Sequence, residues 1–328
     1  MKRLLITCAI PLTMACAGLG ALFILAETPA LAKTEPATLS GDTSSPATLT
    51  AVAATSSPVP SATSSVTANN FAQGILFPYS ILDKALIGNV DKSGNVDYLA
   101  LKGNKNLELF LQAVATADLS QFPTFEVQPD PKDKNGKVTI NRNAELVFWI
   151  NAYNAHLLKT LADAYPIKSP DDIKGLDTDK THRIAGNVYS LQEIREKIIE
   201  FDPRALFALT EGTRGGPMLS MQAYRFYGLN DMLNAAVNTY INDPRNVEVV
   251  RIQNKVTLND FLKQANDLFA NRANSGNRKQ GGLRFLLSAY TDRRGERSYF
   301  TTNDYQIIFK PRDRNLNQKE SPSVVSGS

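Results

Sequence analysis

The segment 211–217, Glu-Gly-Thr-Arg-Gly-Gly-Pro, holds the side chains that could take part in chemistry most directly. Glu211 is an acid that could serve in proton transfer, and Thr213 adds a hydroxyl group to the same loop. The glycines of the loop permit unusual backbone angles. We therefore take Glu211 and Thr213 as catalytic candidates, and Arg214, Gly215 and Gly216 as ligand-binding candidates.

Three further candidates lie on the segment 144–164, whose broad apolar stripe predicts a central core helix. Asn151 and Asn154 stand three residues apart, and asparagine is a poor residue for the middle of a helix. They could pin a crossing loop to the helix, or one of them could contact a ligand or an oxyanion. His156 lies near the edge of the stripe and could be a satisfied structural histidine or a general base. All three are ligand-binding candidates.

The sequence has only two histidines and none of the standard catalytic motifs. The GxSxG, HExxH, P-loop, GxGxxG and SxxK patterns are all absent. A metal site would need carboxylates around one or both histidines, so we predict no metal and no cofactor. The second histidine, His182, lies in the polar stretch 177–183, which predicts a solvated loop histidine.

Hydrophobic periodicity predicts the elements that position these side chains. We expect helices over 79–86, 107–117, 144–164, 190–201, 230–241 and 258–270, and extended segments over 96–98, 188–189, 206–210 and 305–309. Ser190 and Glu193 have the spacing of a capping box. The polar residues 129–136 should lie on the surface. Together these patterns predict an α+β fold, a helix-rich single domain with a small, mostly antiparallel sheet.

The first 32 residues predict an export signal, because two basic residues precede the uncharged run 4–26 and small residues follow it. The run could instead remain as a membrane anchor, and Cys16 could be lipidated. Residues 33–70, rich in Ser, Thr, Ala and Pro, predict a disordered linker. We place the globular domain at 71–317 and a polar tail at 318–328, and we expect the protein in the periplasm or outside the cell.

Export would remove every thiol from the chain. Cys8 and Cys16 are the only cysteines, and both lie in the predicted signal. A cleaved product would therefore have no thiol nucleophile, no disulfide and no zinc-thiolate site.

The charge of the chain is modest. Removing Lys2, Arg3 and Glu27 with the signal leaves 34 of 36 basic and 31 of 32 acidic side chains, a net charge of about +3 that does not favour nucleic acid. The stretch Arg272–Arg297 is locally basic. It could be an ordinary solvated surface, or it could bind an anionic component of the cell envelope.

The octet Phe148–Ala155, Phe-Trp-Ile-Asn-Ala-Tyr-Asn-Ala, resembles the DUF547 family. Further matching segments are Val96-Asp97-Tyr98, Tyr165–Ser169, Ser190-Leu191 with Ile194, Asp202-Pro203-Arg204, Phe207-Ala208-Leu209, Asp313 and Leu316-Asn317. The resemblance covers roughly residues 71–317. It implies the fold, and because the family has a histidine and cysteines near one loop, it suggests thiol-type chemistry by analogy.

This chain departs from the family pattern at that loop. Leu206 stands where the family has its histidine, Glu211 at the first cysteine, Thr213 at a serine, and Gly216 at the cysteine of Gly-Cys-Pro. Arg314 replaces the usual aromatic residue after the terminal aspartate. The resemblance therefore implies the scaffold, but a glycine side chain cannot perform thiol chemistry.

Three hypotheses follow. The leading one is a non-thiol binding or scaffold module at the cell envelope, and the alternative is a hydrolase-type enzyme that uses Glu211 and Thr213 with the two asparagines nearby. The third is a basic wall-binding module, which requires the arginines of 272–297 to form one face. A deep polar cleft at Glu211 and Thr213 would favour the enzyme, whereas a loop filled by Leu206 and Met218 would exclude it.

Overall fold

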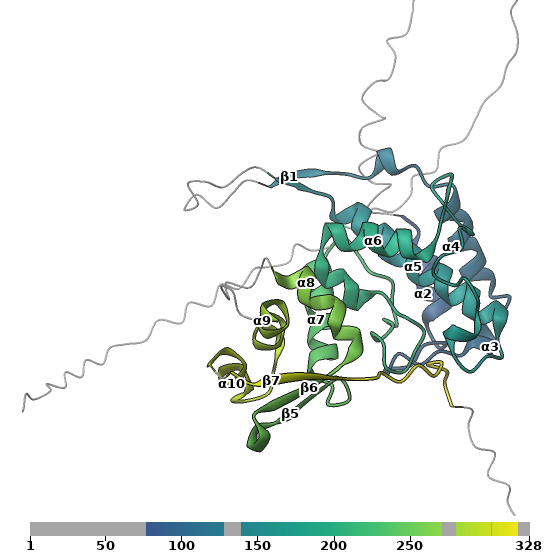
Figure 1. Cartoon of the computed structure of the whole chain (residues 1–328). Helices are drawn as coiled ribbons and strands as arrows, with labels where there is room; N and C mark the ends of the chain where they lie inside the picture. Colours follow the sequence, from purple (N-terminus) through teal and green to yellow (C-terminus); the bar gives the residue numbers. More distant parts are fainter. Residues whose placement is uncertain (1–76, 128–138, 271–279, 303, 321–328) are drawn as a thin grey trace, which may run out of the picture. The chain divides into compact units, whose positions relative to one another are not determined.

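The computed structural model describes residues 77–127, 139–270, 280–302 and 304–320 (Figure 1). The predicted signal 1–32, the linker 33–70 and the surface segment 129–136 lie outside the described residues. Among the described helices, none is long and apolar enough to cross a membrane. The fold is α+β and rich in helices, with small and mostly antiparallel sheets, as the sequence predicts.

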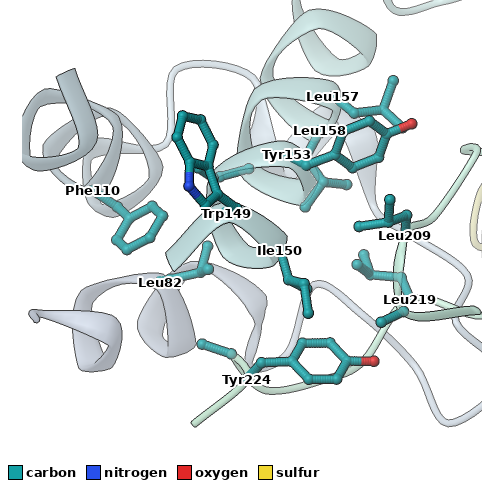
Figure 2. Close-up of a cluster of buried hydrophobic side chains, with 14 of the residues drawn as sticks. Leu82, Phe110, Trp149, Ile150, Tyr153, Leu157, Leu158, Leu209, Leu219 and Tyr224 are labelled. Carbon is teal, nitrogen blue, oxygen red and sulfur yellow. The ribbon is translucent and has the colours of Figure 1, made fainter. Parts of the chain in front are cut away.

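Helix α5 (Asn143–Ala164) forms the centre of the first hydrophobic core. A helix that is apolar on nearly every side must be buried, and residues of α5 on all faces are shielded from solvent. Figure 2 shows Trp149, Ile150 and Tyr153 of α5 pointing into this core. The surrounding helices are α2 (Tyr79–Leu86), α3 (Tyr98–Leu101), α4 (Lys105–Ala115) and α6 (Leu191–Phe201).

A second hydrophobic core follows along the chain. Phe207, Tyr240 and Phe261 contact one another at its centre, with ring centroids 5.0 to 5.8 Å apart. The helices that enclose it are α7 (Leu229–Asn242), α8 (Ala265–Ala270), α9 (Gly281–Tyr290) and α10 (Glu296–Thr302), with the 3-10 helices η3 (Pro203–Ala208) and η5 (Asp260–Gln264). Three further 3-10 turns are η1 (Leu119–Gln121), η2 (Pro170–Asp172) and η4 (Arg251–Gln253).

The described strands form three small sheets. The first pairs β1 (Phe125–Val127) with β2 (Thr139–Asn141), and the second pairs β3 (His182–Ile184) with β4 (Asn187–Tyr189). In the third, β6 (Lys255–Asn259) lies between β5 (Val247–Val250) and β7 (Gln306–Lys310). Only the β6–β7 pair among them is parallel.

Two predicted elements are wrong in type. The segment 206–210 is buried as expected, but most of it belongs to η3, because the Asp202 side chain accepts a hydrogen bond from Arg204 N and Pro203 begins the helix. The segment 258–270 is not one helix. It starts in β6, and the Asn259 side chain then accepts a hydrogen bond from Phe261 N, which caps η5 and leads into α8.

The prediction for His182 is also wrong. This residue lies in β3 and is 5 % exposed. Antiparallel pairing with β4 turns its side chain inward, where its ring centroid is 4.9 Å from that of His156. A polar stretch can still contribute one inward side chain, because side chains alternate between the two faces of a strand.

Candidate functional site

Residues 312–319, which we call the strap, hold the 211–217 loop from one side. The strap follows β7 and runs beside the loop (Figure 1). Backbone hydrogen bonds join Arg214 N to Asn315 O and Gly215 N to Asp313 O, both at 2.9 Å, and Asn317 N to Gly212 O at 3.0 Å. These bonds fix the loop as an added, irregular strand edge.

Asn317 ties the strap to the beginning of the domain. Its Oδ1 accepts a hydrogen bond from the Tyr98 hydroxyl at 2.6 Å, and its Nδ2 donates to Gly94 O at 2.8 Å. Its main-chain carbonyl accepts a bond from Val96 N at 2.7 Å. The side chain is thus satisfied at both ends inside the protein.

Asn151 and Asn154 hold two crossing loops against α5. Asn151 donates to Tyr224 O at 3.0 Å and accepts from Tyr224 N at 2.8 Å. Asn154 donates to Ala208 O at 2.9 Å and accepts from Thr210 N at 3.0 Å. The cavity that both residues line is only about 10 Å³. A ligand role for either asparagine stays a prediction, and it would require these hydrogen bonds to open.

Gly216 lies against the two catalytic candidates. A Cβ atom at this position would stand 2.8 Å from Thr213 Oγ1 and 3.1 Å from Glu211 Oε2. Such distances leave no room for a side chain unless its neighbours move. The space beside Gly216 is therefore occupied by the Glu211 and Thr213 side chains. Leu206 belongs to the second core and Met218 is 41 % exposed, so neither fills the loop.

Glu211 is a buried acid with arginine partners from the strap. Arg312 Nη2 donates to Oε1 at 3.1 Å, and Arg312 Nε lies 3.0 Å from Oε2 without the alignment of a hydrogen bond. Arg314 Nη1 stands 3.9 Å from Oε2. Burial raises the pKa of Glu211, and the two arginines oppose that shift. Among the described groups, Oε2 has no hydrogen-bond partner.

Glu211 lines a cavity of about 680 Å³, which we call the arginine cavity after Arg195, Arg312 and Arg314 in its wall. Each guanidinium group already has a carboxylate partner: Arg195 meets Asp177 at 3.0 Å, Arg312 meets Asp260 at 2.9 Å, and Arg314 meets Asp171. Arg195 also donates to the Tyr153 hydroxyl at 2.9 Å. The wall is therefore a network of ion pairs whose charges largely cancel.

Thr213, Arg214 and Gly216 line a different cavity, of about 910 Å³. We call it the methionine cavity, because Met218, Met221 and Met232 are in its wall. Thr213 is 3 % exposed, and its Oγ1 has no hydrogen-bond partner among the described residues. Gly215 does not join them: its carbonyl accepts from Tyr240 and Asn259, both at 3.0 Å, inside the protein.

A family model described as "Protein of unknown function, DUF547" matches residues 138–241. The matched region contains α5, the crossing segment with η3, the 211–217 loop and α7. Over these residues the chain is similar to the DUF547 family. No curated protein and no solved structure gives a significant match.

The two histidines, His156 and His182, lie within the matched region and are buried. Burial, together with a smaller effect of the neighbouring His182, lowers the pKa of His156 to about 3. His156 Nε2 has no hydrogen-bond partner within the described residues. Burial also lowers the pKa of His182. Neither residue lines the two large cavities, and the described residues contain no group of acids and histidines that could hold a metal ion.

Two arginines of the 272–297 stretch, Arg284 and Arg293, bond inward. Arg284 donates to Tyr305 O at 2.7 Å and lies over the Tyr305 ring. Arg293 donates to Asn242 O and Val247 O at 3.0 and 3.1 Å. Residues 271–279, with three of the basic side chains, lie outside the described residues.

Sequence reasoning missed two groups that belong to the site. Arg195 and Arg312 were not singled out, although both surround Glu211. The spacing of the methionines over 218–232 gives no functional signal in the sequence alone. The pattern Arg312-Asp313-Arg314 was the available signal, because two arginines on one side of an extended segment can meet a single acid.

Proposed function

We propose that this DUF547 chain is an exported, non-thiol binding module of the cell envelope, and that it holds a small ligand in the methionine cavity. The observation that carries the proposal is the position of Thr213, Arg214 and Gly216 on one cavity of about 910 Å³. That volume is within the range of small-molecule sites. Export rests on the predicted signal at residues 1–32 alone.

The surroundings of Gly216 support the non-thiol part of the proposal. The family pattern has a cysteine at this position, and here Glu211 and Thr213 occupy the space that its side chain would need. Arg314, another departure from the family pattern, stands 3.9 Å from Glu211. An ion-paired cluster thus takes the place of the expected thiol site.

The two catalytic candidates open onto different cavities, which favours binding over hydrolysis. Thr213 lines the methionine cavity and Glu211 lines the arginine cavity. A nucleophile and its acid or base must reach the same substrate atom within hydrogen-bond distance. A ligand in either cavity would meet only one of the two.

The test is native mass spectrometry of the full chain, in which any bound compound is released and its mass is measured. Ala235 is an exposed residue of α7 in the wall of the methionine cavity, so we expect Ala235→Trp to fill the cavity and abolish co-purification of the ligand. Leu99→Trp, on a helix surface outside both large cavities and 69 % exposed, is the matched control and should retain it. A bound compound that survives Ala235→Trp would refute the site, and a chain that never carries a compound would refute the function.

A hydrolase-type enzyme is the second candidate, and one observation favours it. Glu211 sits in the arginine cavity with a raised pKa, and the Tyr153 hydroxyl and Arg195 share that cavity. If this candidate holds, the chain should cleave a member of an ester and peptide substrate panel, and Glu211→Gln should lower the rate at least 100-fold. Equal rates for the parent and Glu211→Gln would refute the hydrolase hypothesis.

A further inference from the structure

Every methionine of the chain outside the predicted signal lines one cavity. The sequence has five methionines, of which Met1 and Met14 fall in residues 1–32. The other three are Met218, Met221 and Met232, and all line the methionine cavity. Methionine is unbranched and polarizable, so surfaces built from it adapt to apolar groups of varied shape.

Two of the three methionines have side chains open to solvent, and exposing apolar side chains to water is unfavourable unless a ligand covers them. Met218 and Met221 are each 41 % exposed, although they belong to a segment that is otherwise well anchored. Leu219 and Tyr224 beside them are 3 % and 4 % exposed, and Figure 2 shows both side chains turned toward the first core. Leu219 and Tyr224 thus anchor this segment, whereas the thioether side chains of Met218 and Met221 lie in the open cavity.

The wall of the methionine cavity also contains cations. The charged residues that line it are Lys92, Arg214, Arg245, Lys319, Asp91, Asp243 and Glu320. Arg245 is paired with Asp243 at 2.6 Å, Lys319 donates to Gly88 O at 2.5 Å, and Asp91 accepts from Ser93 and Asn95. The side chains of Lys92 and Arg214 are exposed and make no ion pair or hydrogen bond with the described residues.

Thr213 adds a buried polar atom to the same wall. Its Oγ1 has no partner among the described residues, and the side chain is 3 % exposed. A buried hydroxyl group without a hydrogen bond is unfavourable. The atom is shielded from solvent, so a ligand in the cavity could bond to it only if the surrounding wall moved.

We propose that the methionine cavity binds a free, single-chain carboxylate amphiphile. Its apolar chain lies against the three methionines, and its carboxylate lies toward Lys92 and Arg214. The combination of thioethers with unpaired cations selects this class, because a wholly apolar ligand would leave the cations unused and a small anion would leave the methionines exposed. This inference rests on the proposed function and names its ligand class.

The experiment is isothermal titration of the full chain with dodecanoate below its micelle concentration. We expect saturable one-to-one binding, much weaker binding of butyrate, which lacks the chain, and no binding of dodecyltrimethylammonium, which has the opposite charge. Binding of the cationic amphiphile as tight as that of dodecanoate would overturn the assignment, and so would binding to phosphatidylglycerol vesicles in place of the monomer.

Variants assign the two halves of the ligand. Arg214→Gln should weaken dodecanoate binding about fivefold, the effect of one exposed charge contact. Met218→Gln combined with Met221→Gln should weaken it at least tenfold. The matched controls are Arg183→Gln and Ile252→Gln, both exposed and away from the cavity, and both should bind as the parent does. Unchanged affinity in the two cavity variants would refute the proposal.

The outcomes separate this inference from the proposed function. If a co-purified compound is lost with Ala235→Trp while dodecanoate does not bind, the function stands and the ligand class is wrong. If no compound co-purifies and dodecanoate does not bind, both fail.

Discussion

Asn154 should be among the most important polar residues for the stability of the domain. Its side chain satisfies two buried main-chain groups, Ala208 O and Thr210 N, which lie 54 and 56 positions away in the sequence. Asn154→Ala leaves both groups without a partner, and each buried unsatisfied group costs about 1–3 kcal/mol. Alanine is the better helix residue by about 0.6 kcal/mol, which offsets a small part. We expect the free energy of unfolding to fall by about 3 kcal/mol.

Asn154→Asp sharpens the same prediction, because aspartate is close to asparagine in shape. Its carboxylate can still accept from Thr210 N, but it cannot donate to Ala208 O unless it is protonated. An ionised carboxylate facing a buried carbonyl is more unfavourable than an alanine. We expect Asn154→Asp to be less stable than Asn154→Ala at pH 7 and to recover part of the difference at pH 4.

Urea unfolding followed by tryptophan fluorescence measures these changes. Trp149 is the only tryptophan of the chain and is fully buried on the same helix. Asn106→Ala on α4 is the control, since the Asn106 side chain makes no hydrogen bond with the described residues, and it should change the free energy of unfolding by less than about 0.5 kcal/mol. The reasoning fails if Asn154→Ala costs no more than this control, or if Asn154→Asp shows no dependence on pH.

Three further predictions use the same fluorescence assay. The pKa of His156 is about 3 in the folded protein, so the folded state resists protonation. The free energy of unfolding should therefore fall as the pH drops from about 6.5, by about 1.4 kcal/mol per pH unit at most. His156→Gln should reduce this pH dependence, and an unchanged slope would contradict the burial argument. The pKa of Glu211 is raised in the folded protein, so the ionised side chain destabilises the fold as the pH rises above the ordinary pKa of a glutamate. Arg312→Gln should therefore lower the free energy of unfolding by about 3 kcal/mol at pH 8 and by less at pH 4. Adding Glu211→Gln should restore most of the loss. Tyr98→Phe removes a buried hydrogen bond to Asn317 and should cost about 1–2 kcal/mol, whereas a neutral result would show that the strap is held by its backbone alone.

The sequence was sufficient for elements whose signal is local. The apolar stripe predicted a helix over 144–164, and α5 spans Asn143–Ala164. The capping-box spacing of Ser190 and Glu193 predicted the start of a helix at this point, and both hydrogen bonds of that box are present in α6. Such features depend on residues three or four positions apart, which a reader of the sequence can see together.

The failures occurred where short apolar runs could fit more than one element. Residues 206–210 are buried whether they form a strand or a 3-10 helix, so their apolar character could not distinguish the two. In 258–270 the cap formed by Asn259 divides a strand from a helix, and neighbouring apolar residues hide that boundary. The inward side of His182 depends on its register with β4, which no local pattern reveals.

The candidate site was predictable in its loop but not in its surroundings. Glu211 and Thr213 are recognisable by residue type, but only the folded structure shows that they line two different cavities. Arg312 reaches Glu211 across 101 positions of sequence. A contact at that separation is decided by the packing of all the intervening elements, so residue spacing carries no information about it.

The strap also has a consequence for the order in which the protein can fold. The Tyr98 hydroxyl donates its hydrogen bond to Asn317, which is 219 positions later in the sequence, so this bond can form only after Asn317 has been synthesised. While the chain is being made or threaded through a pore, the 211–217 loop lacks the edge that fixes it, and contacts this distant in sequence form slowly. We therefore expect the methionine cavity to be assembled last, after the strap has been synthesised.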